Sequence, residues 1–476
     1  MTKFTISKKA LAEQPKKYTR LILTEDSTSW HRLVETADGH LEYRMGAGKR
    51  KNATPRKFHT LVRSIVQAAK SHQIEHLAIH LGPMGCPKLE EKGSQWFYRT
   101  LGENLQLATY EFTKYKTQKS KKKELKEILV CGDLKGKDLA AFKAGLVVGA
   151  AANVTRDIAN TTAEDMTPVK LGNAAKKAVL GTKVLVKTLG EKELQKLKMG
   201  LLLAVGGGTK HETKLIVMEY WGAGKPKKDE KSKAKQPIVY VGKGVTYDTG
   251  GLNVKPSGHM HDMHMDMTGG ATVIGAVAAI AKLGFKKNVI GIIPAAENAV
   301  SDSAMRAGDI VKAMNEKTVE VLHTDAEGRM VLADALTYSE RYNPKVVLDI
   351  ATLTGASLVA LGQHASAIMT KDTKLQNILQ ELGETSGDYM WPLPLWDEYQ
   401  APLKSTRADL SNIAVNFSRW GGVIEGGAFL QNFAPKKTLW AHIDIAPRME
   451  SIPSDKLAKG ATGEPVRMLT RFAEEN

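Results

Sequence analysis

Several features that mark other classes of protein are scarce or missing in this sequence of 476 residues. Only two cysteines occur, Cys86 and Cys131, which excludes a disulfide-rich scaffold and predicts buried thiols, although one disulfide between them stays open. The first residues, 1–9, are polar and lack the apolar segment of a secretory signal. The longest apolar runs, such as 271–280, are shorter than a membrane span. We therefore expect a cytoplasmic protein without a membrane segment.

Acidic residues are outnumbered, with 51 Asp and Glu against 68 Lys and Arg, so the formal charge is +17. Such an excess can indicate nucleic-acid binding. Much of it lies in the short runs 49–51, 114–126 and 225–235. The last two lack arginine and nearly lack aromatic residues, so solvated loops are the preferred interpretation and DNA binding is the alternative.

The length and the alternation of strand-like and helix-like patterns predict two α/β domains. We predict an N-terminal α/β domain at 1–136, a connecting helix and linker at 137–164, and a larger C-terminal domain at 165–476. The larger domain should hold a mixed central sheet flanked by helices. The expected strands are 20–24, 76–81, 127–131, 183–186, 199–205, 215–220, 237–241, 288–294 and 346–351, and the expected helices are 57–70, 137–160, 271–282 and 330–338.

Two acids, Asp325 and Glu327, lie two residues apart between a β-branched run and a helical pattern. Carboxylates held this close repel each other unless protons or cations occupy the site. An ordinary acidic turn, with Glu327 near a helix N-terminus, explains the pair equally well on these residues alone.

A second stretch follows the predicted strand 237–241. Lys243 stands between glycines where open α/β sheets bind ligands, and Asp248 precedes Gly250 and Gly251, which allow close approach of the backbone. Together with later residues they form a set of carboxylates without cysteine, which favours hard or borderline divalent ions. A pair of such ions suits hydrolysis of a carbonyl or phosphoryl bond. The set comprises Asp248, Asp266, Asp325 and Glu327, with Lys243, Lys255 and Arg329 beside them.

These motifs resemble those of the leucine (leucyl, cytosol) aminopeptidase family of di-metal peptidases. The family pattern Asn-Thr-Asp-Ala-Glu-Gly-Arg-Leu appears here at 323–330 as His-Thr-Asp-Ala-Glu-Gly-Arg-Met. Further matches lie at 241–251, 255–256, 266–267, 349–355 and 442–446, so the resemblance covers about residues 155–476. Over the first half it is weak and implies only a smaller α/β domain.

The resemblance implies two divalent ions, Zn or Mn, in each subunit. One would be held by Asp248, by Glu327, and by the side chain and backbone carbonyl of Asp325. The other would take Lys243, Asp248, Asp266 and Glu327, with Lys243 uncharged.

The implied reaction is attack of a metal-bridging hydroxide on the first peptide carbonyl, with the free amine on one ion. Lys255 would stabilise the developing charge, and Arg329 would hold a bicarbonate that acts as general base. The resemblance also implies a homohexamer and a preference for N-terminal Leu or Met. The implied substrate pocket comprises Met263, Thr352, Leu353, Gly355, Ala446 and Met449.

The chain departs from the family pattern in several places. His323 and Met330 replace Asn and Leu, and the segment 306–309 lacks the usual proline. The histidines His259, His261 and His264 form a rim of the substrate cleft in the preferred interpretation and an extra metal site in the alternative. An accessory or regulatory protein that binds nucleic acid on the same scaffold is the second hypothesis for function, and phosphoryl hydrolysis is a third.

Overall fold

The computed structural model describes residues 2–118, 122–227, 235–418 and 420–476. The chain packs into two units, one of Met1–Ala150 with Ser451–Lys459 and one of Ala151–Glu450 with Gly460–Asn476. Helix α4 (Gly136–Ala159) begins in the first unit and ends in the second. No sequence pattern indicated that residues 451–459 belong with the first unit. The domain boundaries proposed at 136 and 164 stay predictions, since packing alone does not show where a domain folds independently.

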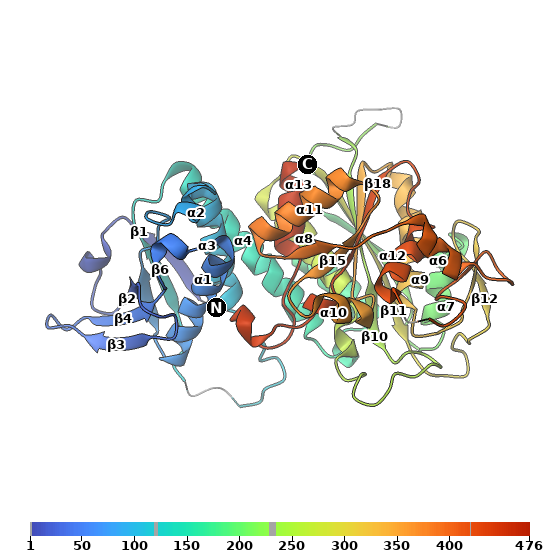
Figure 1. Cartoon of the computed structure of the whole chain (residues 1–476), viewed down its shortest axis with the longest axis horizontal. Coiled ribbons are helices and arrows are strands. Elements are labelled where there is room, and N and C mark those ends of the chain that lie inside the picture. The colour runs from blue at the N-terminus through green and yellow to red at the C-terminus, as the bar shows by residue number, and fades with distance from the viewer. Residues whose placement is uncertain (1, 119–121, 228–234, 419) are drawn as a thin grey trace. The chain divides into compact units, whose positions relative to one another are not determined.

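The first unit is built on a six-stranded sheet in the order β1-β6-β5-β2-β4-β3 (Figure 1). All neighbouring pairs are parallel except β3 and β4. Helix α1 starts after Thr54, whose side chain accepts a hydrogen bond from the Lys57 N–H, and it buries apolar residues at helical spacing. The strands and α-helices of the first unit that precede α4 are β1 (Lys3–Ser7), β2 (Thr19–Thr24), β3 (His31–Glu35), β4 (Leu41–Gly46), α1 (Pro55–Ser71), β5 (His76–Ile79), α2 (Pro87–Glu90), α3 (Ser94–Ala108) and β6 (Glu127–Cys131).

The second unit contains a mixed nine-stranded sheet in the order β16-β15-β18-β14-β9-β11-β8-β7, with β10 paired to β11. The central strands β18, β14, β9 and β11 are parallel, so their carboxyl ends lie at one edge. A small sheet, β12-β13-β17, lies apart from this path. The strands are β7 (Leu185–Leu189), β8 (Lys214–Trp221), β9 (Ile238–Gly242), β10 (Gly244–Asp248), β11 (Asn288–Asn298), β12 (Ile310–Lys312), β13 (Thr318–Glu320), β14 (Val346–Ala351), β15 (Ser366–Met369), β16 (Met390–Pro392), β17 (Leu410–Ser411) and β18 (Leu439–Asp444).

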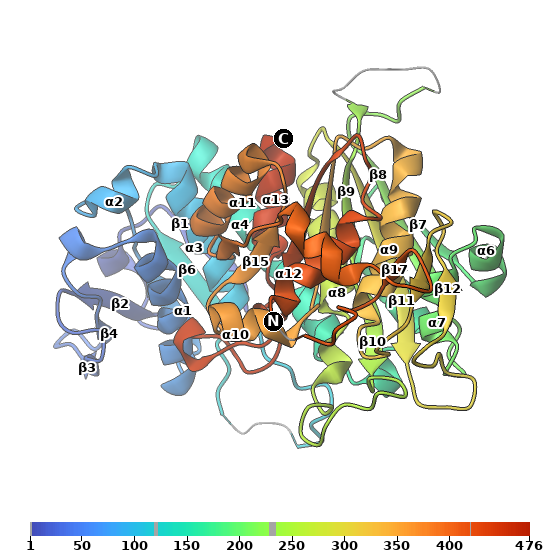
Figure 2. The ribbon, with the colours of Figure 1, turned by 45° about the vertical axis from the view of Figure 1, so that its right-hand side comes forward.

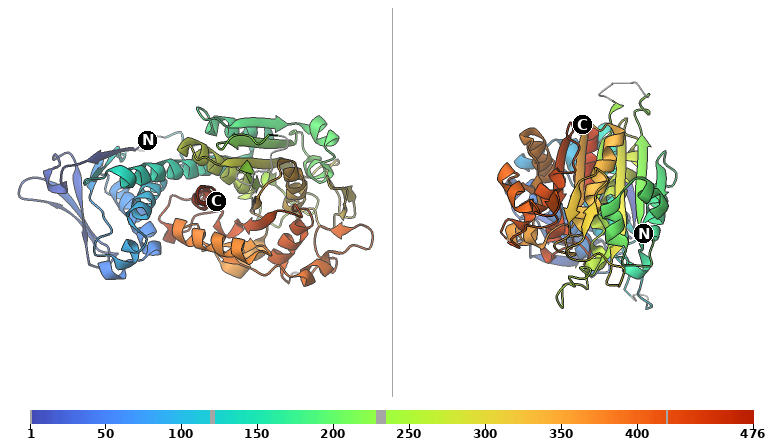
Figure 3. Two further views of the ribbon diagram at one scale, coloured as in Figure 1. Left: turned by 90° about the horizontal axis from the view of Figure 1, so that it is seen from above. Right: turned by 90° about the vertical axis from the view of Figure 1, so that its right-hand side faces the viewer.

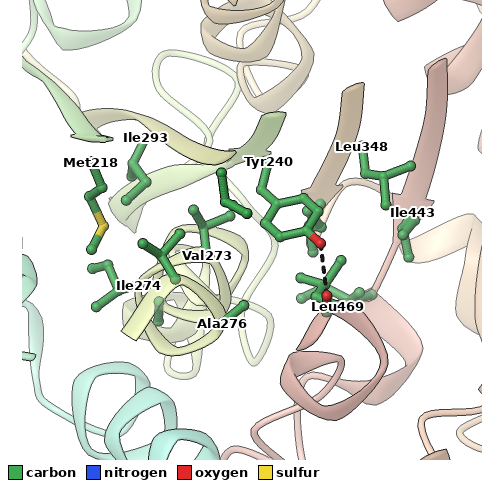
Figure 4. Packing of buried hydrophobic residues seen from close by; sticks show 14 of the residues in the cluster. Met218, Tyr240, Val273, Ile274, Ala276, Ile293, Leu348, Ile443 and Leu469 are labelled. Carbon is green, nitrogen blue, oxygen red and sulfur yellow. Dashed lines mark hydrogen bonds between the residues drawn. The ribbon is translucent and has the colours of Figure 1, made fainter. Parts of the chain in front are cut away.

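Helices cover both faces of the large sheet (Figure 3). Alternate residues of β9 point to opposite faces, and Tyr240 packs in one apolar cluster while Val239 and Val241 pack in another. On the first face the buried Tyr240 hydroxyl donates to the Leu469 carbonyl at 2.7 Å (Figure 4). The helices are α5 (Pro168–Ala178), α6 (Glu191–Lys196), α7 (Gly200–Gly206), α8 (Thr268–Leu283), α9 (Gly328–Ser339), α10 (Gly355–Leu361), α11 (Thr373–Ser386), α12 (Gly422–Gln431) and α13 (Val466–Glu475).

One stretch, Met263–Leu283, is long and apolar enough to cross a membrane by length and composition, although we expected no segment of that kind. Its most apolar window is 83% buried inside the protein. Helix α8, which makes up most of it, lies in the apolar cluster beneath the large sheet. This burial is that of a core helix.

Two α/β units were predicted, and the fold class is confirmed. One element was wrong: residues 199–205 were expected to be partly a strand, but α7 is a helix that buries Leu201, Leu202 and Val205. A short run that is apolar throughout has no periodicity, so only its packing decides between helix and strand. The basic runs at 114–126 and 225–235 include residues 119–121 and 228–234, which lie outside the described residues.

Candidate metal centre

The predicted acids meet beyond the carboxyl ends of the central strands. Lys243 follows the end of β9, and its backbone N–H donates to the carbonyl of Ile350 in β14. Asp248 ends β10 and is aligned with Asn298 at the end of β11. This edge is where open parallel sheets place their ligand sites.

Ligand oxygens of Asp248, Asp325 and Glu327 lie within 4.8 Å of one another, and among the described residues they form the only such group of acids, histidines or cysteines. Asp248 and Glu327 are 2% and 1% exposed. Glu327 is the residue before α9, yet its side chain makes no capping hydrogen bond. Its carboxylate instead lies 2.8 Å from the Lys243 ammonium, so an ordinary helix-capping turn does not describe this acid.

Two lysines are inserted among these acids. Lys243 Nζ lies 2.8 Å from Asp266 Oδ2 and donates to the Thr352 carbonyl at 3.1 Å. Lys255 Nζ lies 2.8 Å from Asp248 Oδ2 and 2.5 Å from Asp325 Oδ1. The structure therefore brings all the predicted ligands, and Lys255, into one cluster.

The cluster is short of hydrogen bonds and of positive charge. Four buried oxygens accept no hydrogen bond of good geometry, although a lysine is in ion-pair contact with some of them: Asp266 Oδ2, Asp325 Oδ1, and Oε1 and Oε2 of Glu327. Four carboxylates face two ammonium groups, which leaves an excess of two negative charges. Unsatisfied carboxylate oxygens in this number fit hard divalent cations, which prefer oxygen ligands.

Burial controls the protonation of these acids. It raises the pKa of Glu327 to about 7, and repulsion from Asp248 adds to the effect while Lys243 opposes it. Burial also raises the pKa of Asp266 to about 7 and that of Asp325 to about 6. Burial disfavours the Lys243 ammonium, but Asp266, Glu327 and Asp248 together raise its pKa above the usual value. Without cations the carboxylates thus hold protons near neutral pH, which is the behaviour of a crowded anionic site.

Neutral side chains hold the acids in place, and of those named here only Thr352 was predicted as a site residue, for the substrate pocket. Asn298 Nδ2 donates to Asp248 Oδ1 at 2.8 Å and to the Thr324 carbonyl at 3.1 Å. The Thr352 hydroxyl donates to Asp266 Oδ1 at 2.8 Å. Thr324 lies inside the motif at 323–330, and its hydroxyl donates to the Gly250 carbonyl at 2.6 Å, but nothing in its residue type distinguishes a supporting hydroxyl from a surface one.

Two glycines give the site its close packing. Gly250 has φ +88°, and a Cβ there would lie 2.4 Å from the Asn253 carbonyl oxygen and 3.1 Å from Asp325 Oδ1. A Cβ on Gly328 would lie 2.6 Å from Lys243 Nζ. At both positions only glycine leaves room for the charged groups.

The comparisons with known proteins agree with this arrangement. The model of the cytosol aminopeptidase family, catalytic domain, matches residues 153–470, and that of the family's N-terminal domain matches residues 44–119. The chain belongs to the cytosol aminopeptidase family. It is a hydrolase of the peptidase class and an aminopeptidase.

Related sequences support this membership over nearly the whole chain. A probable cytosol aminopeptidase of Paraburkholderia phymatum is 39% identical over 431 residues, which cover 90% of this chain and 82% of the relative. The cytosol aminopeptidase of Haemophilus influenzae is 39% identical over 429 residues, which cover 90% and 84%.

Solved structures of similar fold include two enzymes. The bottromycin maturation enzyme BotP in complex with Mn aligns with a TM-score of 0.84 at 29% identity, covering 97% of this chain and 99% of that one. A mutant of tomato leucine aminopeptidase aligns with a TM-score of 0.86 at 27% identity, covering 100% and 97%. The Mn-bound neighbour and the acidic cluster together indicate that this family member binds divalent metal.

The pocket residues expected from the family lie on the loops and short helices near this edge of the sheet. Met263 begins a single-turn helix, Met263–Met265, that packs against β10. Gly355 begins α10, which packs against the short helix Ala446–Arg448. The Leu353 backbone N–H donates to Asp444 Oδ1 at 3.1 Å. Thr352 is buried, and Met449 is half-buried.

The histidines of the segment 259–264 do not gather into a metal site among the described residues. His261 lies 2.7 Å from Asp262, and His264 contacts the backbone carbonyl of His261. Their rim position in the aminopeptidase cleft stays a prediction.

Unlike Lys243 and Lys255, Arg329 makes no ion-pair contact with the acids of the cluster among the described residues. It is 7% exposed, and its Nη1 donates to the Asn412 carbonyl at 2.8 Å. Its Nε is buried without a hydrogen-bond partner. Burial lowers the pKa of this guanidinium, and the charges of Glu425, Glu327 and Asp444 oppose that shift.

Proposed function

We propose that this chain is a metal-dependent aminopeptidase that removes N-terminal apolar residues, with Leu and Met preferred, from peptides by means of two divalent ions. The observation that carries the proposal is the excess of buried acid over base around Glu327, with four buried oxygens that accept no hydrogen bond of good geometry. The family membership supports the peptidase activity, and the acidic cluster supports the binding of metal ions.

The residues fit two ions that share ligands. Asp248, Asp325 and Glu327 would hold one ion, with the Asp325 carbonyl contributing, and Lys243, Asp248, Asp266 and Glu327 would hold the other. Bound Zn or Mn would supply an activated water and polarise the substrate carbonyl. Lys243 is charged while it pairs with Asp266 and Glu327, so it must release a proton before its nitrogen serves as a ligand.

Lys255 is proposed to act on the substrate. Burial opposes its charge, but Asp248, Glu327 and Asp325 raise its pKa, so the ammonium keeps its proton. When those acids are engaged by cations, its N–H groups are free to bind the carbonyl oxygen of the first peptide bond and the charge that develops there. Arg329 is proposed to complete the site with an anion, a place that the family resemblance gives to bicarbonate.

Assembly and location are also proposals. The relatives are named cytosol aminopeptidases, which supports a cytoplasmic enzyme, and the family resemblance supports a homohexamer. Sedimentation of the purified protein tests the hexamer directly. Nucleic-acid binding stays the alternative role, and no contact of the described residues favours it over the peptidase.

The decisive experiment measures metal content and turnover on the same preparation. The protein is loaded with Mn or Zn, desalted, and assayed for metal per subunit and for release of leucine from a chromogenic leucine amide. We expect two equivalents of metal, and activity that a chelator abolishes and added metal restores. The N-acetylated amide is the control and should not be cleaved. Fewer than two equivalents at saturation, or cleavage of the blocked amide, would contradict the proposal.

A further inference from the structure

Helix α12 carries a buried acid that neither the metal cluster nor the fold accounts for. Its sequence, GVIEGGAFLQ, is apolar apart from Glu425 and its last residue. Glu425 is 6% exposed, and its neighbours Val423, Ile424 and Ala428 belong to the apolar cluster on this face of the sheet. A lone carboxylate in such a helix costs stability unless a positive group compensates for it.

The compensating group is Arg329. Burial raises the pKa of Glu425, and Arg329 is the charge that opposes the shift. In turn, Glu425 is the largest attraction on Arg329, ahead of Glu327 and Asp444. The packing of the helices is consistent with this interaction, because α12 packs against α9, which contains Arg329, and against α10 (Figure 2). A Cβ on the next residue, Gly426, would lie 3.7 Å from Arg329 Nη2 and 2.9 Å from Leu353 Cδ2.

The pair is not an ordinary structural salt bridge. Among the described residues no carboxylate is in ion-pair contact with Arg329, and its Nε stays buried without a hydrogen-bond partner. Elsewhere in this unit a buried arginine closes on its acid: Arg448 Nη2 lies 2.8 Å from Glu464 Oε1, and its Nε donates to Oε2 at 3.1 Å. Glu425 therefore acts on Arg329 without an ion-pair contact, and the residue after it packs beside the Leu353 side chain of the predicted substrate pocket.

This arrangement bears on what Arg329 binds. A small anion from solution that approached Arg329 would also approach the buried charge of Glu425, and two anions in a poorly hydrated place repel strongly. Glu425 and Glu327 both attract the Arg329 guanidinium, so an incoming anion would compete with negative groups that the chain already supplies.

We propose that Glu425 supplies, from within the chain, the anionic group that completes the Arg329 site, so that turnover does not draw bicarbonate from solution. The inference rests on the proposed aminopeptidase function. Glu425 is a positioning residue in this scheme, since it acts through Arg329 rather than on the metals.

The test is anion dependence in buffer depleted of carbon dioxide. Metal-loaded wild-type protein should turn over a leucine amide at the same rate, within about twofold, with and without added bicarbonate or formate. Glu425→Ala should lose about 10²-fold in kcat, as expected when a positioned charged group is removed. Bicarbonate or formate should restore at least about tenfold of that loss in a saturable way, because the deletion leaves room for a small anion. Glu425→Gln should be equally slow and should not be restored, because the amide fills the space without charge.

Thermal unfolding gives a readout that does not depend on turnover. Formate should raise the Tm of the Glu425→Ala holoenzyme by about 1 °C or more and leave the wild-type Tm unchanged. The matched control is Glu320→Ala, which removes a glutamate of the same 6% exposure. Its partner Arg407 is exposed, so water replaces the carboxylate, and formate should have no effect.

Several results would overturn the inference while leaving the peptidase assignment intact. They are stimulation of the wild type by bicarbonate of several-fold, full kcat in Glu425→Gln, and a formate response in Glu320→Ala equal to that of Glu425→Ala. If the metal-loaded wild type releases no leucine, the proposed function fails, and the Tm shifts still show whether Glu425 and an external anion compete for Arg329.

Discussion

Two clusters of buried charge lie in the second unit, and they differ in balance. Around Glu327, four carboxylates face two lysines, and four buried oxygens accept no hydrogen bond of good geometry. Around Asp388, two acids face two arginines, and each acid oxygen accepts a hydrogen bond. Asp388 Oδ1 accepts from Arg467 Nε at 2.8 Å, and Oδ2 accepts from the Met468 N–H at 2.9 Å. The Glu464 oxygens accept from Arg448.

This difference distinguishes a binding site, the Glu327 cluster, from a structural salt-bridge network, the Asp388 cluster. The acid oxygens of the Asp388 cluster are all hydrogen-bonded as folded, so a cation could only displace donors that are already bound. The Glu327 cluster is incomplete, and cations would finish it. Burial alone does not distinguish the two, since Glu327 and Asp388 are each 1% exposed.

The largest expected effect is that of Glu327→Gln. The change removes a shared ligand but keeps the shape, so we expect kcat/KM to fall by about 10³-fold or more and metal content to fall below two equivalents. Metal analysis and the leucine amide assay measure both. Glu320→Gln, a buried acid outside the cluster, should keep its metal and its rate. Full turnover by Glu327→Gln would show that the unsatisfied acids are not the catalytic centre.

Lys255→Met should come next. The apolar side chain cannot stabilise charge on the substrate, so kcat should fall by about 10²–10³-fold. Metal content should stay at two equivalents, because Lys255 contacts the acids only as an ion pair. Loss of metal together with rate would mean that this lysine organises the cluster rather than the substrate.

Asp388→Ala should lower stability without affecting metal binding, because the Asp388 cluster is structural. It leaves Arg467, which is 1% exposed, without its main acid, so we expect a loss of about 3–5 kcal/mol in the free energy of unfolding. Chemical denaturation measures the loss. Protein that remains folded should still bind two metals, and a fall in metal content there would contradict the distinction between the clusters.

The smallest effect is a pH dependence of metal stabilisation. The pKa values of Asp266 and Glu327 are raised to about 7, so in metal-free protein these acids favour folding below about pH 4 and lose that contribution as pH rises through 7. Metal must displace their protons, so the rise in Tm on adding Mn should be large at pH 7.5 and small at pH 5. An equal rise at both values would show that these acids are not ligands.

Much of the fold could be read from periodicity. Strand β6 has the predicted bounds, and the long helix α4 differs from its prediction by one residue at each end. Patterns of this kind report which face of an element is buried. They failed at α7, which is apolar throughout, and at 451–459, where no pattern shows that a late segment packs with the first unit.

The sequence by itself determined the chemistry available to this protein: acids, lysines and glycines in an order that matches one family of peptidases. It did so because those residue types and their spacings are properties of the chain. Only the tertiary structure decided which acids are short of hydrogen bonds, and that α12, which carries Glu425, packs against α9, which carries Arg329. Hydrogen-bond satisfaction and charge balance depend on distances between elements, and no local pattern encodes them.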